Sequence, residues 1–208
     1  MRYERKYRIE VSDPLRIHHE LMSNPCGFRQ AYPDRRVNSI YYDDVDYNAY
    51  NANLIGIGHR TKYRVRWYGD SLSTIAQPIL EKKIKKNLLG TKEYLKLPDF
   101  NLDQAAPELP QDFTYPANQL YPYIIVRYHR TYLESIDGHL RATIDRDLEY
   151  INLLNGQPTS ATKKDTGIIL EIKYEEDKTK EARLCTSMLP YRLTKNSKYV
   201  SAMQCYLH

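Results

Sequence analysis

The sequence has no long apolar run, few cysteines and no glycine-rich phosphate loop. No stretch approaches the roughly 20 apolar residues that a membrane-spanning helix needs. Cys26, Cys185 and Cys205 lack metal-site spacing and cannot all pair, which favours a reducing, cytoplasmic setting. The first residues of the sequence are charged and lack the apolar segment of a secretion signal. We therefore expect a cytoplasmic protein without a transmembrane segment, and tethering to a membrane through partner proteins stays open.

Phenylalanine and tryptophan are scarce, at three residues and one, whereas tyrosine occurs 20 times. Tyrosine suits half-buried pleated surfaces, and its hydroxyl can reach water or an anion. The net charge of +5 permits an anionic ligand without requiring one. No internal repeat is present, and a chain of this length can bury its own core. Residues 1–208 are predicted to form a single domain.

Alternating side chains predict a mainly β (α+β) fold with about eight strands and peripheral helices. Strands are expected at 2–10, 37–42, 60–68, 79–86, 91–97, 123–134, 140–145 and 167–174, with a turn at 87–90. Helices are expected at 14–23, 180–188 and 197–207. The absence of a βαβ rhythm favours an antiparallel barrel or sandwich. The proline-rich segment 98–122 is interpreted as a connector, with a lid over a site as the other interpretation.

Charged side chains collect on one face of these strands, because successive strand residues point to opposite sides. In the strand at 60–67, one face carries Arg60, Lys62, Arg64 and Arg66, and the other is largely aromatic or apolar. The same alternation groups Glu4 with Lys6, Glu81 with Lys83, Tyr128 with Arg130, Arg141 with Thr143 and Asp145, and Glu171 with Lys173. A solvated face would also carry charges. Six strands with so narrow a set of residues favour a binding surface instead.

A linear chain of phosphates fits such a surface. If the strands closed into a barrel, the cations would repel one another unless an anion lay between them. Arginine gives bidentate contacts to phosphate oxygens, and lysine gives a compact positive charge. The glutamates among the cations suit Mg²⁺ or Mn²⁺, which bridge phosphate oxygens.

Short motifs that run in a fixed order along the chain resemble the VTC domain. This family is the polyphosphate polymerase branch of the triphosphate tunnel metalloenzymes, which also include the CYTH-type triphosphatases. The matching segments are residues 3–7, 39–43, 62–69, 80–83, 127–131, 141–145, 170–174 and 195–199. The resemblance implies an eight-stranded antiparallel tunnel barrel over the whole chain. It also implies metal-dependent transfer of the γ-phosphate of ATP onto a polyphosphate chain.

The resemblance also implies roles for individual residues. Those at phosphate-binding positions are Lys6, Arg64, Arg66, Lys83, Lys92, Tyr128, Arg130, Lys195, Ser197 and Lys198, and Arg141 is added from its charged strand face. Arg64, Arg66, Arg130 and Lys83 are the candidate catalytic residues. Glu171 is the candidate ligand for Mn²⁺ or Mg²⁺. Since the acceptor is already an anion, this phosphoryl transfer needs positioning and charge neutralisation more than a strong base.

Three other functions stay open at this point. The first is a tripolyphosphatase or nucleoside triphosphatase. That branch carries Glu-x-Glu-x-Lys on its first strand, whereas Arg2 replaces the first glutamate here, which favours the polymerase. The second is a non-catalytic polyphosphate or inositol-phosphate sensor. The third is a nucleic-acid-binding barrel, which needs exposed aromatics beside its cations. We expect no nucleic acid, because the tyrosines mostly fall on the face opposite the cations.

Overall fold

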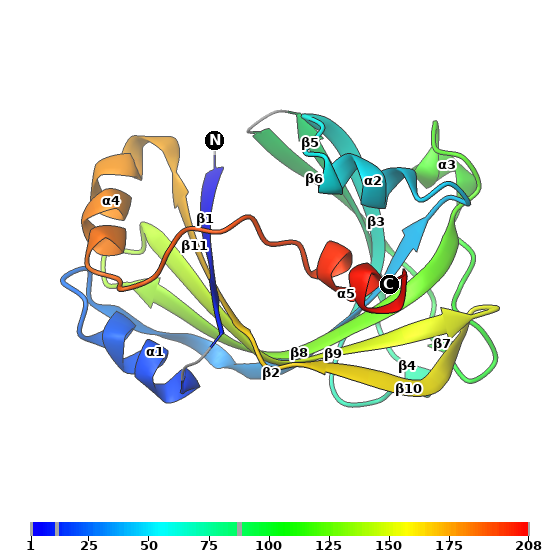
Figure 1. The fold of residues 1–208 in the computed structure, drawn as a ribbon, viewed down its shortest axis with the longest axis horizontal. Coiled ribbons are helices and arrows are strands. Elements are labelled where there is room, and N and C mark those ends of the chain that lie inside the picture. Colours follow the sequence, from blue (N-terminus) through cyan, green and yellow to red (C-terminus); the bar gives the residue numbers. More distant parts are fainter. Residues whose placement is uncertain (1, 11–12, 87–88, 208) are drawn as a thin grey trace. The chain divides into compact units, whose positions relative to one another are not determined.

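The computed structural model describes residues 2–10, 13–86 and 89–207. As predicted, the fold is mainly β, with antiparallel strands and peripheral helices (Figure 1). The strands are β1 (Arg2–Ile9), β2 (Phe28–Asp43), β3 (His59–Tyr68), β4 (Thr74–Ile75), β5 (Ile79–Lys86), β6 (Leu89–Lys96), β7 (Phe100–Asn101), β8 (Tyr121–Ser135), β9 (Leu140–Leu154), β10 (Gln157–Asp165) and β11 (Ile168–Glu175). The α-helices are α1 (Pro14–Met22), α2 (Asn48–Leu54), α3 (Gln111–Thr114), α4 (Thr179–Ser187) and α5 (Lys198–Leu207), and a 3₁₀ turn covers Glu176–Lys178.

The main sheet has the strand order β1-β11-β9-β8-β2-β3-β5-β6, with β10 paired to β9. Strands β4 and β7 form a separate pair. Within the described ranges the main sheet has nine strands, and β6 does not pair with β1, so a closed barrel is not detected. No helix in that part of the chain is long and apolar enough to cross a membrane. The predicted turn at 87–90 lies partly outside the described residues.

The chain divides into two compact units. Unit 1 consists of Met1–Arg35, Tyr128–Leu148 and Asp165–Asn196, and unit 2 consists of Arg36–Arg127, Glu149–Lys164 and Ser197–His208. Strands β2, β8 and β9 contribute residues to both units. Each unit has its own apolar core, and each is described separately below.

The core of unit 1 lies between one face of the β1, β11 and β9 strands and helices α1 and α4 (Figure 1). Leu170 and Ile172 point from β11 into this core, and Ile17 of α1 and Ala182 of α4 meet them there. Alternation therefore directs Glu171 to the opposite face of the sheet. The outer edge of β1 is covered by the segment before α5, which forms a bridge between Tyr7 and Leu193.

The core of unit 2 holds the apolar face of β3, with Tyr63, Val65 and Trp67 all buried. The proline-rich segment 98–120 packs on this core through Leu102, Phe113 and other apolar residues. The hydroxyl of Tyr63 donates a hydrogen bond of 2.9 Å to the carbonyl of Thr114. The interpretation of this segment as a lid over the charged site is therefore wrong, because it covers the apolar face instead.

Two predicted strands are longer than expected. Strand β2 begins at Phe28 rather than at residue 37, because its first half is mostly exposed and shows no apolar alternation. Strand β9 continues from Asp145 to Leu154. Asp147 has a positive φ of 54°, and beyond it Leu148 and Tyr150 are buried at even positions before the odd positions Ile151 and Leu153 become buried. Strand β10 was missed because it is largely exposed and polar and shows no apolar alternation.

Candidate functional site

In unit 2, the predicted charged face of β3 forms rows with its neighbouring strands. Arg64 lies opposite Glu81 of β5, and Glu81 lies opposite Tyr94 of β6. The adjacent row consists of Lys62, Lys83 and Lys92, one from each of the same three strands. We call Lys62, Lys83 and Lys92 the lysine row. Like charges directly opposite one another destabilise strand pairing. A bound anion would offset this repulsion, so the lysine row is a candidate anion-binding feature of unit 2.

Glu81 holds the two arginines next to the lysine row. Its Oε2 accepts a 2.5 Å hydrogen bond from Arg64 Nε, and its Oε1 lies 3.6 Å from Arg66 Nη1. Burial would raise the pKa of Glu81, but Arg64, Arg66 and Lys92 together lower it below the ordinary value. Glu81 thus acts as a counter-ion that fixes both guanidinium groups on the charged face.

Replacing Glu81 with glutamine is expected to destabilise unit 2 by about 3 kcal/mol at neutral pH, because the buried Arg66 and the largely buried Arg64 lose the carboxylate between them. A lowered folded-state pKa gives stability that is present above the ordinary value of 4.5 and lost as the pH falls below it. The variant should therefore show a flatter loss of stability under acid, measured by urea unfolding at a series of pH values. Glu93→Gln, a half-exposed change on β6, is the control. An unchanged acid profile in Glu81→Gln would contradict this role.

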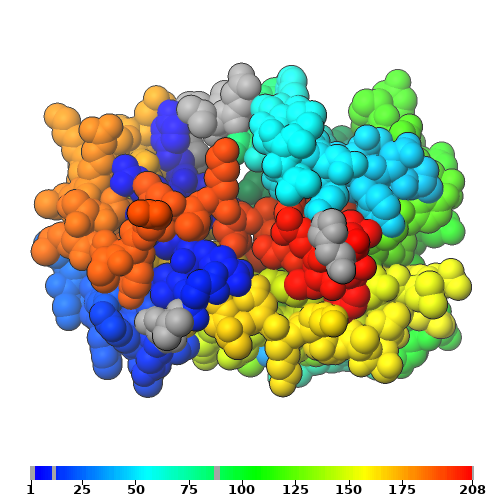
Figure 2. All heavy atoms as spheres, in the orientation of Figure 1, coloured from blue at the N-terminus to red at the C-terminus, as the bar shows by residue number. Residues whose placement is uncertain are grey.

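Ser197 and Lys198 stand at the start of α5, and unit 2 brings Ser197 to the lysine row. Lys62 Nζ donates a 2.9 Å hydrogen bond to Ser197 Oγ. Tyr199 anchors helix α5, because its ring stacks on Tyr41 and its hydroxyl donates a 2.6 Å hydrogen bond to Asp43 Oδ2. Figure 2 shows this C-terminal helix, in red, against the cyan segment that includes α2. The position of Ser197 is thus set by packing within unit 2.

Asp43 and Asp44, at the end of β2, accept hydrogen bonds from the first turn of α2. Asp43 accepts hydrogen bonds from the backbone N–H groups of Ala49 and Tyr50, both at 2.9 Å. Asp44 Oδ1 accepts one of 3.0 Å from Asn48 N. These bonds fix α2 beside β3 and assign no chemistry to the two carboxylates.

In unit 1, the charged face gathers around Glu171. Lys6 of β1 and Thr143 of β9 lie opposite it on either side. Glu171 lies 3.4 Å from Lys6 Nζ and 2.7 Å from Lys173 Nζ, and Lys6 also lies 3.1 Å from Glu4. Burial would lower the pKa of Lys6, but Glu171 and Glu4 outweigh it and raise the pKa above its ordinary value. Lys6 therefore stays cationic at any physiological pH.

Arg130 forms the most buried ion pair of unit 1. Its Nε and Nη2 donate hydrogen bonds of 2.6 and 2.7 Å to the two carboxylate oxygens of Asp145, which is fully buried. Burial would lower the pKa of Arg130, but Asp145 and the other anionic groups raise it well above the ordinary value. The guanidinium also lies over the Tyr128 ring, 5.2 Å from its centroid. The predicted pairing of Tyr128 and Arg130 on one face is therefore observed.

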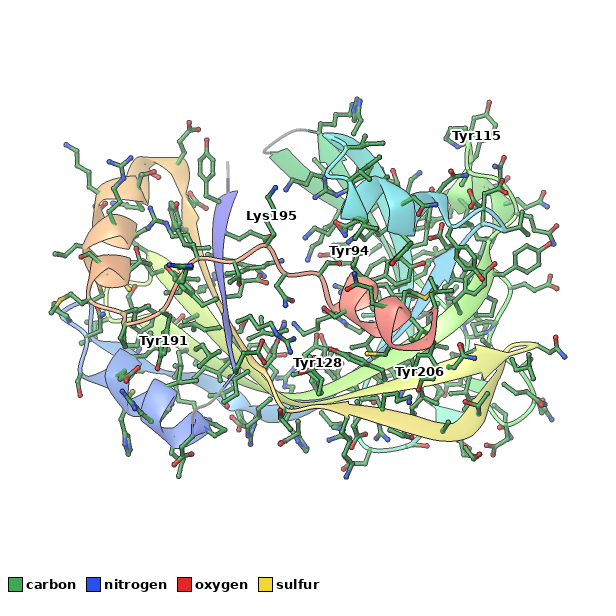
Figure 3. All side chains as sticks on the ribbon, in the orientation of Figure 1. Tyr94, Tyr115, Tyr128, Tyr191, Lys195 and Tyr206 are labelled. Carbon is green, nitrogen blue, oxygen red and sulfur yellow. The ribbon has the colours of Figure 1, made fainter. Side chains whose placement is uncertain are left out.

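The remaining predicted residues of unit 1 lie farther along the same face or next to it. Arg141 is exposed and lies opposite Lys173 at the next row of the sheet. Lys195 is exposed on the extended segment that follows the bridge to β1, and Figure 3 shows it there before α5. The backbone of this segment is tied to β1 by the bond from Thr194 N to the carbonyl of Lys6, at 2.9 Å.

The donor set around Glu171 fits a divalent metal that shares its coordination with phosphate. Among the described residues, no group of three or more His, Cys, Asp or Glu side chains could hold a metal by itself. Glu171 nevertheless offers a buried carboxylate, and within the described ranges the buried Oγ1 of Thr143 opposite it has no hydrogen-bond partner. Magnesium commonly uses one or two carboxylates, with waters and substrate phosphates as its other ligands.

Sequence reasoning missed the roles of two residues on these faces. Lys62 carried the correct parity but was not selected as a ligand, and Asp145 was not recognised as the partner of Arg130. The expectation that the tyrosines mostly lie opposite the cations does not hold at Tyr41 and Tyr94, which stand opposite Arg64 and Glu81 respectively. Parity gives the face of a residue, but register and side-chain reach decide which residues meet.

Comparison with known proteins identifies one domain family and solved structures of similar fold. The VTC domain family matches residues 1–207. A search of the curated proteins finds no match. A solved structure of a candidate adenylyl cyclase from Hippeastrum, described as having a dominant triphosphatase activity, has a TM-score of 0.54 and 13% identity, covering 99% of this chain and 96% of that one. A candidate adenylate cyclase from Vibrio parahaemolyticus has a TM-score of 0.53 and 12% identity, with 97% and 98% covered.

The family match spans nearly the whole chain, and the solved structures share its fold over their full length. The eight motifs identified in the sequence fall on the strands and on the segment before α5 that carry the charged faces. The chain therefore belongs to the VTC domain family.

Proposed function

We propose that this protein is a metal-dependent polyphosphate polymerase of the cytoplasm, which transfers the γ-phosphate of ATP onto a polyphosphate chain inside a basic tunnel. The observation that carries this proposal is the lysine row, in which three cations from adjacent strands stand directly opposite one another. A row of this kind suits a ligand with closely spaced negative charges. Membership of the VTC family supports a phosphate chain as that ligand.

Both units hold groups that are suited to binding phosphate. In unit 2, Arg64 and Arg66 present guanidiniums fixed by Glu81, and the lysine row extends the cationic surface along β3. In unit 1, Arg130 is held rigid by Asp145, and Lys6 stands beside Glu171. These groups bind and orient phosphate oxygens, and pre-oriented cations stabilise the charge that develops during phosphoryl transfer.

Glu171 would hold the divalent metal, Mn²⁺ or Mg²⁺, together with phosphate and water oxygens. When bound, such a metal neutralises phosphate charge and favours transfer. Until it binds, Lys6 and Lys173 neutralise the carboxylate of Glu171. The proton on Lys6 stays in place, so Lys6 acts as a fixed cation rather than as an acid.

Incubation of the protein with ATP and Mn²⁺ is expected to yield polyphosphate chains that are resolved by size on a gel. Glu171→Gln should lower the metal-dependent rate about 100-fold or more, because metal assistance is worth several kcal/mol. Glu175→Gln, an exposed change at the end of the same strand, should keep the rate. No product longer than pyrophosphate would refute the polymerase. Metal-dependent activity that survives in Glu171→Gln would refute the metal assignment.

A triphosphatase is the second candidate, because the Hippeastrum protein of the same fold is described with that activity. The same incubation separates the two, since a hydrolase releases orthophosphate and builds no chain. Tight binding of polyphosphate without any metal-dependent turnover would instead support a non-catalytic binding module.

A further inference from the structure

Asn53, near the end of α2, contacts the charged face of unit 2 through Ser197. Its Nδ2 donates a 3.0 Å hydrogen bond to Ser197 Oγ. The helix that carries Asn53 is fixed by the caps of Asp43 and Asp44. The amide is therefore held against the serine by the fold of unit 2, not by a chance contact of a mobile side chain.

The oxygen of Ser197 is surrounded by donors. Asn53 Nδ2 and Lys62 Nζ approach it at 3.0 and 2.9 Å, and Val200 N of α5 lies 3.5 Å away. A hydroxyl has two acceptor lone pairs and one proton. In the part of the chain that the structure describes, Ser197 has no acceptor for that proton. With its lone pairs engaged, the hydroxyl can make its remaining bond only as a donor.

We infer that Asn53 is a positioning residue that, together with Lys62, makes Ser197 a hydrogen-bond donor to an ionised phosphate oxygen of the ligand. This inference deepens the proposed function and rests on its phosphate-binding part. An ionised phosphate oxygen is an acceptor without a proton, so it matches the direction that the hydroxyl is forced to take. The ammonium of Lys62 lies beside Ser197 and would also attract the phosphate oxygen. Hydrogen bonds that involve a charged group are stronger than those between neutral groups.

Variants at Asn53 test the direction of this bond. In Asn53→Asp the carboxylate accepts the serine proton and turns it away from the ligand, so the dissociation constant for tripolyphosphate should rise about 30-fold. In Asn53→Ala the serine is only less constrained, and a rise of about 3- to 5-fold is expected. Asn51→Asp places the same charge on the same helix at an exposed position and should change the constant less than about 3-fold. Isothermal titration calorimetry without metal measures all three.

A double-mutant cycle separates positioning from a structural role. If Asn53 acts through the hydroxyl, Asn53→Ala should cost nothing further in a Ser197→Ala background. An equal loss in both backgrounds would overturn the inference, as would Asn53→Asp binding no worse than Asn51→Asp. If the wild-type chain binds neither tripolyphosphate nor longer polyphosphate, the proposed function falls together with this inference. Thermal unfolding of each variant confirms that the binding data come from folded protein.

Discussion

Asp145→Asn is expected to cost about 3–5 kcal/mol of unfolding free energy, because it leaves the buried guanidinium of Arg130 without its counter-charge. Asp145 is fully buried and receives both hydrogen bonds of the bidentate pair. Urea unfolding at neutral pH measures the loss. The matched control is Asp147→Asn, two residues along the same strand, where an exposed carboxylate faces His129 and the change should stay within about 0.5 kcal/mol.

The reason for keeping a buried ion pair is also testable. Apolar residues of similar size often replace such a pair without loss of stability. The double variant Arg130→Met with Asp145→Leu should therefore be more stable than Asp145→Asn and yet bind tripolyphosphate far more weakly than the wild type. If the double variant bound the anion normally, Arg130 would have only a structural role. If Asp145→Asn matched its control in stability, the pair would not be the anchor of this face.

The sequence predicted the faces of the strands well, for a physical reason. Parity grouped Arg64 with Arg66 on β3 and Glu81 with Lys83 on β5, and the observed register puts both groups on one side, because directly opposite residues share a face. The same argument placed Lys6 and Glu171 together in unit 1. Helices α1, α4 and α5 were also found within one or two residues, because capping residues and apolar spacing mark their ends.

The register between strands could not be predicted in the same way. Nothing in the alternation of β3, β5 and β6 says that Lys62, Lys83 and Lys92 fall in one row, since a shift by two residues keeps every parity and changes every partner. The bond from Lys62 to Ser197 joins residues 135 positions apart in the chain. Such contacts depend on how the strands pair and on where α5 packs, neither of which leaves a local pattern.

Burial of charge was the other feature that sequence could not give. Asp145 lies on the charged face by parity, yet it is fully buried and engaged with Arg130. Asp147, two positions later, is exposed. Asp145 ends the motif at residues 141–145 and Asp147 lies two residues beyond it, and the path of β9 makes the first a buried partner of Arg130 and the second a surface charge.

Lys83→Gln is expected to weaken polyphosphate binding about 10- to 100-fold while leaving the ligand-free protein as stable as the wild type, or more stable by up to about 1 kcal/mol. Lys83 is the central member of the lysine row, with a lysine directly opposite on both sides. Its replacement relieves repulsion between lysines in the ligand-free protein and removes a contact to phosphate in the ligand-bound protein. Thermal unfolding without ligand and calorimetric binding of polyphosphate at several salt concentrations measure the two effects.

The opposite signs of these two effects are what make the lysine row a binding feature. Replacing a residue that serves only the fold lowers the stability of the protein. Replacing a residue that serves anion binding keeps or raises that stability and lowers the affinity for the anion. The dependence of affinity on salt should also become weaker in Lys83→Gln, by about one ion in the slope, because one fewer phosphate is neutralised. Lys86→Gln lies on the same strand with opposite parity and should change neither quantity. A loss of stability with unchanged affinity in Lys83→Gln would remove the observation on which the proposed polymerase rests.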